Sequence, residues 1–366
     1  MKFLTTEKIS ELELINYALK KEGVRELSHK TEINKLGEGA WHYAYLIEKE
    51  QLVLRIPKRT AYDQAVVFNR EELMVEYAST KAFYQHANKA KEGVCPTYFN
   101  YFVQAELTYT MESFLGESIA IGNQTIEQSK YYGRELGEVF LALESLDPPF
   151  EGIGYLQMGG NGELKGQIDM DLKEFILQET KDYVNELNSL ISSDFEFDKE
   201  KVLETARKIF LSRSIESEKR VLTNQDTSPE NIIFAKTGVK IIDPYPLIYS
   251  GSSLAANHVF NYSTFFPTAN DTIRYGRGNY HLYKHHLQAN AEGFIEGYTD
   301  GSLQKRRNIN AECFFKLVSM ADIHYQLLNE KSLNREQTIR FGTKEQIEKR
   351  LKLYLYELEC FSLSMI

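Results

Sequence analysis

Residues 221–248 read VLTNQDTSPENIIFAKTGVKIIDPYPLI, short apolar runs joined by polar loops. The first loop contains Asp226 and Asn231, and a later apolar run ends at Asp243, 12 residues after Asn231. A Lys-Thr-Gly turn between the runs predicts a β-hairpin. Because the two ends of a hairpin meet at its open side, we expect two carboxylates and one amide to lie together there.

Oxygen-bearing side chains in this arrangement fit phosphoryl transfer. Asn231 and Asp243 offer hard oxygen ligands of the kind that Mg²⁺ prefers, and Asp226 would face the hydroxyl group that accepts the phosphoryl group. From these residues alone a second interpretation stays open, an ordinary hairpin whose loop acids are merely solvated.

The segment resembles the catalytic and metal-binding loops of the aminoglycoside phosphotransferase and choline kinase group, relatives of the eukaryotic protein kinases. Residues from about 33 to 330 can be laid on that pattern. The resemblance implies that Asp226 is the catalytic base and that Asn231 and Asp243 hold Mg²⁺. It also implies ATP, or alternatively GTP, as the phosphoryl donor and a small-molecule hydroxyl as the acceptor.

Two positions in the loop depart from the related patterns. Asn224 stands where the family usually has a histidine that helps to hold the geometry of the loop, which leaves the rate in question more than the reaction. Gln225 stands where protein kinases carry the arginine that reads a phosphorylated activation loop. We therefore expect no control by phosphorylation of that kind.

A glycine-rich turn lies near the start of the chain, in the segment LGEGAWH, residues 36–42. Gly37 and Gly39 have no β-carbon, so backbone N–H groups there could approach the phosphates of a nucleotide. A third glycine is missing, and an ordinary β-turn explains the same residues.

The strand LVLRIPK, residues 52–58, follows this turn. The resemblance places Arg55 at the position of the cation that contacts the α- and β-phosphates. A glutamate on the next helix holds that cation in the family, and Glu72 and Glu76 share one helical face, of which Glu76 precedes the apolar positions and is preferred. An exposed strand cation and a surface glutamate remain the alternatives.

Met111, Glu112 and Ser113 lie where the resemblance puts the connection between two lobes. Their backbone groups are predicted to hydrogen-bond the adenine base. Strand edges offer such groups to any planar base, so the side chains add little to this prediction.

Hydrophobic periodicity predicts an α+β protein with two lobes, and the resemblance implies that these form a protein-kinase-like fold. Alternating segments and one helix in the front third indicate a small antiparallel-sheet lobe, and long helical patterns follow. A helix opens the chain, with its cap expected at Thr5-Thr6. The expected parts are an N-terminal helical extension (1–30), a nucleotide-binding N-lobe (31–111) and a C-lobe with the catalytic loop and substrate-binding helices (112–366).

Composition limits the partners. The chain has 366 residues with 43 basic and 52 acidic side chains, a formal net charge of −9, which argues against non-specific nucleic-acid binding. No long apolar segment or secretory signal is present, and three distant cysteines read as reduced thiols, so we expect a cytoplasmic protein without a membrane role. The sequence leaves a monomer and a homodimer open.

The acidic excess falls in residues 112–366 and favours a cationic acceptor, such as an aminoglycoside or another amine-bearing compound. A role in antibiotic resistance would follow from an aminoglycoside acceptor. Neutral sugars, homoserine and a macrolide stay open as acceptors, because many proteins are acidic merely for solubility.

Other functions were weighed against the kinase. Asn224, the missing third glycine and an arginine in place of lysine at Arg55 motivate a nucleotide-binding pseudokinase that acts as a scaffold or regulator. A protein kinase proper would need an Ala-Pro-Glu sequence after Asp243, and none follows.

Two further segments have ambiguous patterns. His281 and His285 are four residues apart with His286 adjacent, a spacing that can hold zinc but that more often marks solvated or core histidines. The aromatic-rich residues 260–283 could line an acceptor pocket or pack the helical lobe.

Overall fold

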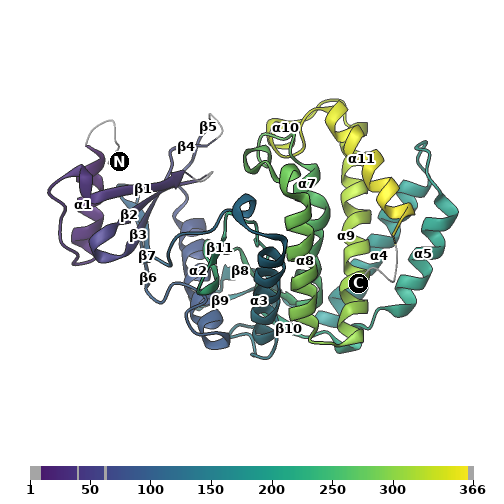
Figure 1. The fold of residues 1–366 in the computed structure, drawn as a ribbon, viewed down its shortest axis with the longest axis horizontal. Coiled ribbons are helices and arrows are strands. Elements are labelled where there is room, and N and C mark those ends of the chain that lie inside the picture. Colours follow the sequence, from purple (N-terminus) through teal and green to yellow (C-terminus); the bar gives the residue numbers. More distant parts are fainter. Residues whose placement is uncertain (1–9, 39–40, 62–63, 362–366) are drawn as a thin grey trace.

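The computed structural model describes residues 10–38, 41–61 and 64–361, and it has two lobes (Figure 1). The small lobe is built on an antiparallel sheet in the order β1-β2-β3-β7-β6. These strands are β1 (Ile33–Glu38), β2 (His42–Ile47), β3 (Leu52–Pro57), β6 (Phe99–Val103) and β7 (Thr108–Ser113). A short ribbon of β4 (Thr60–Ala61) and β5 (Gln64–Ala65) projects beyond β3.

Helix α1 (Glu11–Lys21) covers one face of this sheet. Ser10 caps the helix: its hydroxyl accepts from the Glu13 N–H, and the Glu13 carboxylate accepts from the Ser10 N–H at 2.7 Å. The cap expected at Thr5-Thr6 lies outside the described residues. The buried side chains of α1 pack into one core with the strands and are Leu14, Ile15, Ala18 and Leu19. The N-terminal helix therefore closes the small lobe.

Helix α2 (Arg70–Ala90) begins after Asn69, whose side chain accepts hydrogen bonds from the first turn. The second half of α2 belongs to the core of the large lobe, where Phe83, Tyr84 and Ala87 are almost completely buried. One helix thus connects both lobes, which fixes its side chains relative to the loops of the large lobe.

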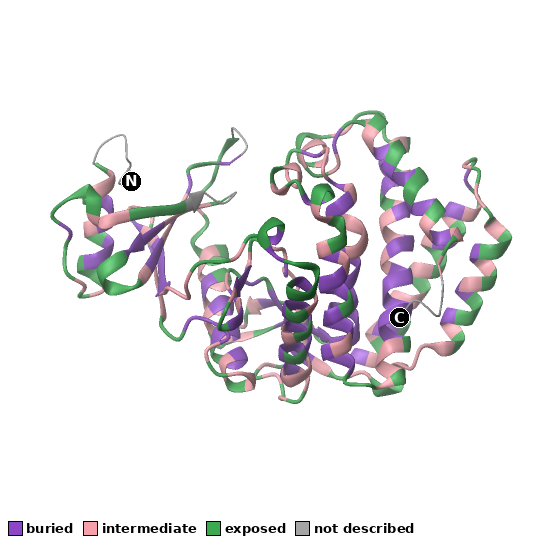
Figure 2. Cartoon of the chain, viewed as in Figure 1, coloured by how far each residue is buried: buried purple, intermediate pink, exposed green. Residues whose placement is uncertain are grey.

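The large lobe is mainly helical (Figure 1). Its long helices are α3 (Ile126–Glu144), α4 (Leu172–Ile191), α5 (Lys199–Ser212), α6 (Gly251–Phe260), α8 (Lys284–Thr299), α9 (Leu303–Asn329) and α11 (Lys344–Glu359), with the shorter α7 (Phe266–Thr268) and α10 (Arg335–Phe341). Buried residues lie along the facing sides of these helices, and exposed residues cover their outer sides (Figure 2). No helix within the described ranges combines the length and apolarity of a membrane span.

Helices α3 and α8 pack unusually close together through glycines. A Cβ on Gly293 would lie 1.9 Å from the Lys130 carbonyl oxygen, and one on Gly133 would lie 1.9 Å from that of Asn290. No side chain fits at such distances, so the contact requires glycine. The close approach positions Asn290 of α8 against His258, which in turn contacts Thr227 in the loop that contains Asp226.

Two sets of strands complete the large lobe. A sheet in the order β10-β13-β8-β9 contains β10 (Arg220–Asn224), β13 (Pro246–Ser250), β8 (Ile153–Met158) and β9 (Leu164–Ile168), and β11 (Ile232–Ala235) with β12 (Gly238–Ile241) forms a separate hairpin. The predicted α+β two-lobed fold is confirmed. The β8–β9 hairpin was not expected from the sequence.

Candidate functional site

The β11–β12 hairpin brings Asn231 and Asp243 to the same end. Ile232 pairs with Ile241, and just beyond that pair the Ile242 N–H donates to the Asn231 carbonyl at 3.0 Å. Asp243 is exposed and has a left-handed backbone with φ of 47°. A non-glycine residue in this region is strained, and such strain is often found at functional sites.

Asn224 holds the loop that carries Asp226. Its buried amide donates to the Asp226 carbonyl at 2.8 Å and accepts from the Asp226 N–H at 3.0 Å. The same amide oxygen accepts from the Tyr245 N–H at 2.8 Å, two residues after Asp243. One side chain therefore ties the Asp226 loop to the segment that follows Asp243.

A buried network supports the same loop from below. His258 Nδ1 lies 2.9 Å from the Thr227 hydroxyl and Nε2 lies 3.1 Å from Asn290 Oδ1, while the Tyr262 hydroxyl donates to the Thr227 carbonyl at 3.0 Å. Burial lowers the pKa of His258 to about 3, so its imidazole is neutral at pH 7. Because Asn290 Oδ1 can only accept, Nε2 carries the proton and Nδ1 accepts from Thr227.

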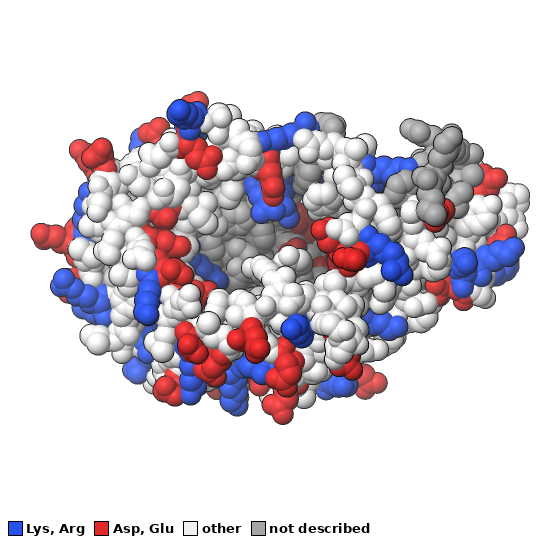
Figure 3. Space-filling view, turned by 180° about the vertical axis from the view of Figure 1, so that it is seen from behind, with Lys and Arg blue, Asp and Glu red and all other residues white. Residues whose placement is uncertain are grey.

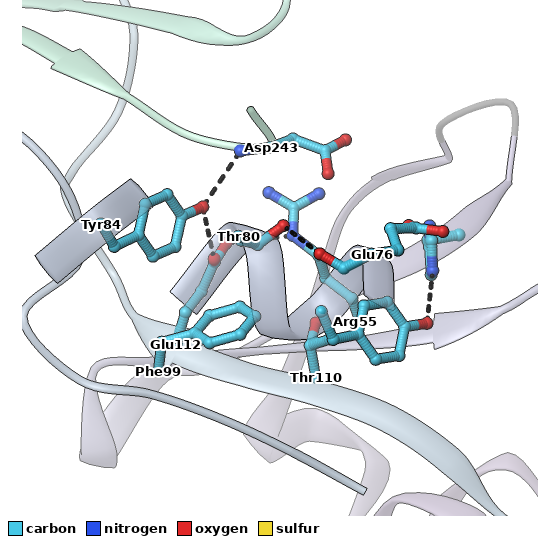
Figure 4. A pocket seen from close by; sticks show the side chains of 10 residues that line it. Arg55, Glu76, Thr80, Tyr84, Phe99, Thr110, Glu112 and Asp243 are labelled. Carbon is cyan, nitrogen blue, oxygen red and sulfur yellow. Dashed lines mark hydrogen bonds and ion pairs between the residues drawn. The ribbon is translucent and has the colours of Figure 1, made fainter. Parts of the chain in front are cut away.

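Arg55 forms its ion pair with Glu112, and the Nε to Oε1 distance is 3.0 Å. The other Glu112 oxygen accepts from the Tyr84 hydroxyl at 3.0 Å, and Tyr84 in turn accepts from the Asp243 N–H at 3.0 Å. The Arg55 guanidinium is directed toward the Asp243 carboxylate (Figure 4). Tyr84 thus connects the cation of the small lobe to the proposed metal ligand of the large lobe.

The ion-pair partner of Arg55 is Glu112 of β7, whereas the sequence predicts Glu76 of α2. Arg55 pairs with Thr110 across the sheet, and Glu112 lies two residues further along β7, hence on the same face. Glu76 belongs to α2 and lines the same small pocket as Arg55 and Asp243. Although solvent reaches part of Glu76, loss of hydration raises its pKa to about 7, with a smaller contribution from Asp243.

The pocket lies where the lobes meet, and residues of β2, β3, α2, β6, β7 and the turn after β12 line it. The lining residues are His42, Arg55, Glu76, Tyr77, Thr80, Tyr84, Phe99, Thr110, Glu112 and Asp243. His42 Nε2 lies 3.0 Å from the Tyr77 hydroxyl. Burial lowers the pKa of His42 to about 4, and Asp243 opposes this shift while Arg55 adds to it.

The remaining predicted nucleotide contacts belong to the glycine-rich turn and to β7. Gly37 lies in β1, opposite Ala44 and beside an irregularity in the pairing, and Gly39 lies outside the described residues. Met111 is completely buried beneath α1, and the Ser113 N–H donates to the Tyr98 carbonyl at 3.0 Å. Contacts of Met111, Glu112 and Ser113 with a base stay a prediction.

Neither ambiguous segment forms a site of its own. His281 lies in a 3-10 turn and His285 in α8, and both side chains are exposed. No group of three or more His, Cys, Asp or Glu side chains in the described part of the chain could hold a metal ion. Within residues 260–283, Tyr262, Phe266 and Tyr280 are buried in the core, so these rings pack the lobe.

No protein-family model matches the sequence, and no curated protein matches it. Solved structures do match. Two are thermostable mutants of aminoglycoside phosphotransferase APH(4)-Ia, one in ternary complex with AMP-PNP and hygromycin B and one with ADP and hygromycin B. They are 14% and 13% identical to this chain, each with a TM-score of 0.52 and with 95% of this chain and 98% of that chain covered. This chain has the aminoglycoside phosphotransferase fold.

A third match is a choline/ethanolamine kinase family protein from Mesorhizobium loti, 12% identical, with a TM-score of 0.46, and 95% of this chain and 99% of that chain covered. At these identities the aminoglycoside phosphotransferase fold is what the comparisons establish.

Proposed function

We propose that this chain is an ATP-dependent phosphotransferase that transfers the γ-phosphoryl group to a hydroxyl of a small molecule. The observation that supports it most is the linkage of Asp226, Asp243 and Arg55, through Asn224 and Tyr84, around the junction of the lobes. Nucleotide would lie between the lobes, with Arg55 near its phosphates and the glycine-rich turn above them.

Asp226 would orient the acceptor hydroxyl and take its proton. One of its oxygens, Oδ1, accepts from the Ser228 N–H at 3.0 Å, which fixes the rotation of the carboxylate. Asn224 binds the Asp226 backbone and Tyr262 binds the Thr227 carbonyl, so the carboxylate is positioned before substrate arrives.

Asn231 and Asp243 fit a magnesium ion in their chemistry. They offer an amide oxygen and a carboxylate at one hairpin end, both hard ligands, and Mg²⁺ commonly uses few protein ligands beside phosphate oxygens and water. When bound, the ion would neutralise charge on the transferred group. Glu112 engages Nε of Arg55, which leaves the outer edge of the guanidinium directed toward the same place.

The acceptor proposed from the charge of the chain is an aminoglycoside or another amine-bearing compound, and GTP remains an alternative donor. APH(4)-Ia was crystallised with hygromycin B, which makes that compound a natural first member of a panel.

The second candidate is a pseudokinase that binds nucleotide without transfer. The observation in its favour is that Arg55 pairs with Glu112 of its own sheet rather than with a glutamate of α2.

One experiment separates the two candidates. Purified protein is incubated with Mg²⁺-ATP and a panel of amines, sugars and antibiotics, and ATP consumption is measured. The phosphotransferase hypothesis predicts turnover of ATP with one of these acceptors. Asp226→Asn should lower the turnover rate by about 10²–10⁴-fold, whereas Asp194→Asn, a change in an exposed loop, should leave it unchanged. The chain has a single tryptophan, Trp41, which is half-exposed beside the glycine-rich turn. A change in its fluorescence on adding Mg²⁺-ATP, with no acceptor consumed, would favour the pseudokinase.

A further inference from the structure

Tyr155 and Tyr245 form an exposed aromatic pair next to the Asp226 loop. Their ring centroids are 5.0 Å apart with the planes inclined by 49°, and the side chains are 36% and 53% exposed. Tyr155 faces outward from β8, and Tyr245 follows Asp243-Pro244. Exposed rings of this size offer a large contact area with a small loss of side-chain entropy, as in many ligand sites.

Hydrogen bonds fix both tyrosines to the loop that carries Asp226. The Tyr155 hydroxyl donates to Gln225 Oε1 at 2.7 Å. The Gln225 N–H donates to the Tyr245 carbonyl at 3.0 Å, and the Tyr245 N–H donates to Asn224. The Tyr155 ring is therefore anchored by its hydroxyl and the Tyr245 backbone by two hydrogen bonds, next to the residue that precedes Asp226, which lowers the entropy cost of stacking a ligand on the pair.

The tyrosine pair also adjoins the turn that carries Asp243. Tyr245 follows Asp243 by two residues, and its N–H is bound by Asn224, which also binds the Asp226 backbone. The pair therefore lies next to both the Asp226 loop and the turn after β12.

The surface of the molecule is hollowed at the junction of the lobes. Figure 3 shows a hollow between the small lobe and the helical part, and its visible walls are mostly residues other than Lys, Arg, Asp and Glu, with charged side chains around the rim.

We infer that Tyr155 and Tyr245 are the acceptor-binding surface, and that they take a hydroxyl-bearing compound through an uncharged ring face, such as a sugar or an aromatic ring. The inference rests on the proposed function, because it places the acceptor beside Asp226. The inference requires the acceptor to have a flat ring next to the reacting hydroxyl, which the net charge of the chain does not indicate.

The test measures binding of three probes by saturation-transfer NMR: phenyl β-D-glucopyranoside, methyl β-D-glucopyranoside and the polycation spermine. Wild-type protein is expected to bind the phenyl glucoside tightest. Tyr245→Ala should weaken that binding by about tenfold or more, and Tyr245→Phe should retain it. Both backbone hydrogen bonds of Tyr245 survive the substitutions, and thermal unfolding checks the fold. Tyr356→Ala, a change at another exposed tyrosine, on α11, is the control and should bind as the wild type does.

Two results would overturn the inference. The first is phenyl glucoside binding that is absent in the wild type or the same in Tyr245→Ala. The second is spermine binding tighter than the phenyl glucoside and lost in Tyr245→Ala, which would assign the pair to cations. Failure of the proposed function looks different: Trp41 fluorescence shows no response to Mg²⁺-ATP, while phenyl glucoside binding and its loss in Tyr245→Ala persist.

Discussion

The Tyr84 hydroxyl accepts a hydrogen bond from the Asp243 backbone N–H at 3.0 Å, at the junction of the lobes. The same hydroxyl donates to Glu112, the partner of Arg55. Its burial raises the pKa of Tyr84 well above the ordinary value, so the phenol stays protonated and can serve both bonds. The position of Asp243 is thereby coupled to the position of Arg55.

Tyr84→Phe is expected to lose both bonds while keeping the ring in the core. The buried Glu112 carboxylate and the Asp243 N–H each lose a partner, so we expect a loss of about 1–3 kcal/mol in the free energy of unfolding. The rate of phosphoryl transfer should fall more than the affinity for nucleotide, because Asp243 is no longer aligned with Arg55. Denaturant unfolding and steady-state kinetics measure the two effects. Tyr17→Phe, at an exposed position of α1, is the control, and equal stability of both variants would contradict the role of Tyr84.

Asn224→Asp keeps the shape of the side chain and its two accepted hydrogen bonds, but it removes the donor to the Asp226 carbonyl. It also introduces a charge at a position that is 1% exposed. We expect a destabilisation of about 2–3 kcal/mol and a lower turnover rate. Asn185→Asp on the exposed side of α4 makes the same chemical change without burial. Similar melting temperatures for the two variants would show that Asn224 does not hold the loop.

Asp243→Asn tests the metal assignment. The backbone N–H that binds Tyr84 is retained, and asparagine tolerates the left-handed conformation well, so the fold should survive. Activity should fall by at least about 100-fold, with a higher Mg²⁺ concentration needed for half-maximal rate. A magnesium titration of both proteins gives the comparison. Unchanged kinetics would reject Asp243 as a ligand.

His258 predicts a stability that declines in mild acid. Its pKa of about 3 in the folded protein lies below the ordinary value of 6.5, so protonation favours the unfolded chain. The stabilisation is complete above pH 6.5 and is lost as the pH falls toward 3, with about 2 kcal/mol lost by pH 5. Unfolding measured from pH 7 to 5 should be flatter in His258→Gln than in the wild type. The exposed His285→Gln should keep the wild-type slope; if it does not, the slope arises elsewhere.

The spacing of Asp226, Asn231 and Asp243 predicts their shared hairpin because residues at a hairpin end are brought together by local pairing alone. Arg55 illustrates the limit of such reasoning. Alternation along the strand places it on the cleft side, but its partner depends on the pairing of β3 with β7, 57 residues apart in sequence. Without the register between β3 and β7, the local sequence pattern cannot decide whether Glu76 or Glu112 is the ion-pair partner of Arg55.

Other residues of the site leave no local signal. Tyr84 and His258 read as ordinary helix residues among apolar neighbours, and their polar atoms acquire a role only when α2 and α6 pack against the loops. The β8–β9 hairpin escaped prediction because it is short and bounded by glycines, in a region dominated by helical periodicity. Tyr155 could not be placed beside Tyr245 without it.

Phe83, Tyr84 and Ala87 anchor α2 in the large lobe, although the front of that helix faces the small sheet. Swinging the helix away with the sheet would expose two large aromatic rings to water, at about 2–3 kcal/mol each. We therefore predict that the proposed nucleotide would enter and leave by movement of the sheet relative to a stationary α2. If α2 stays fixed, amide hydrogen exchange in its second half should be slow both with and without ligand.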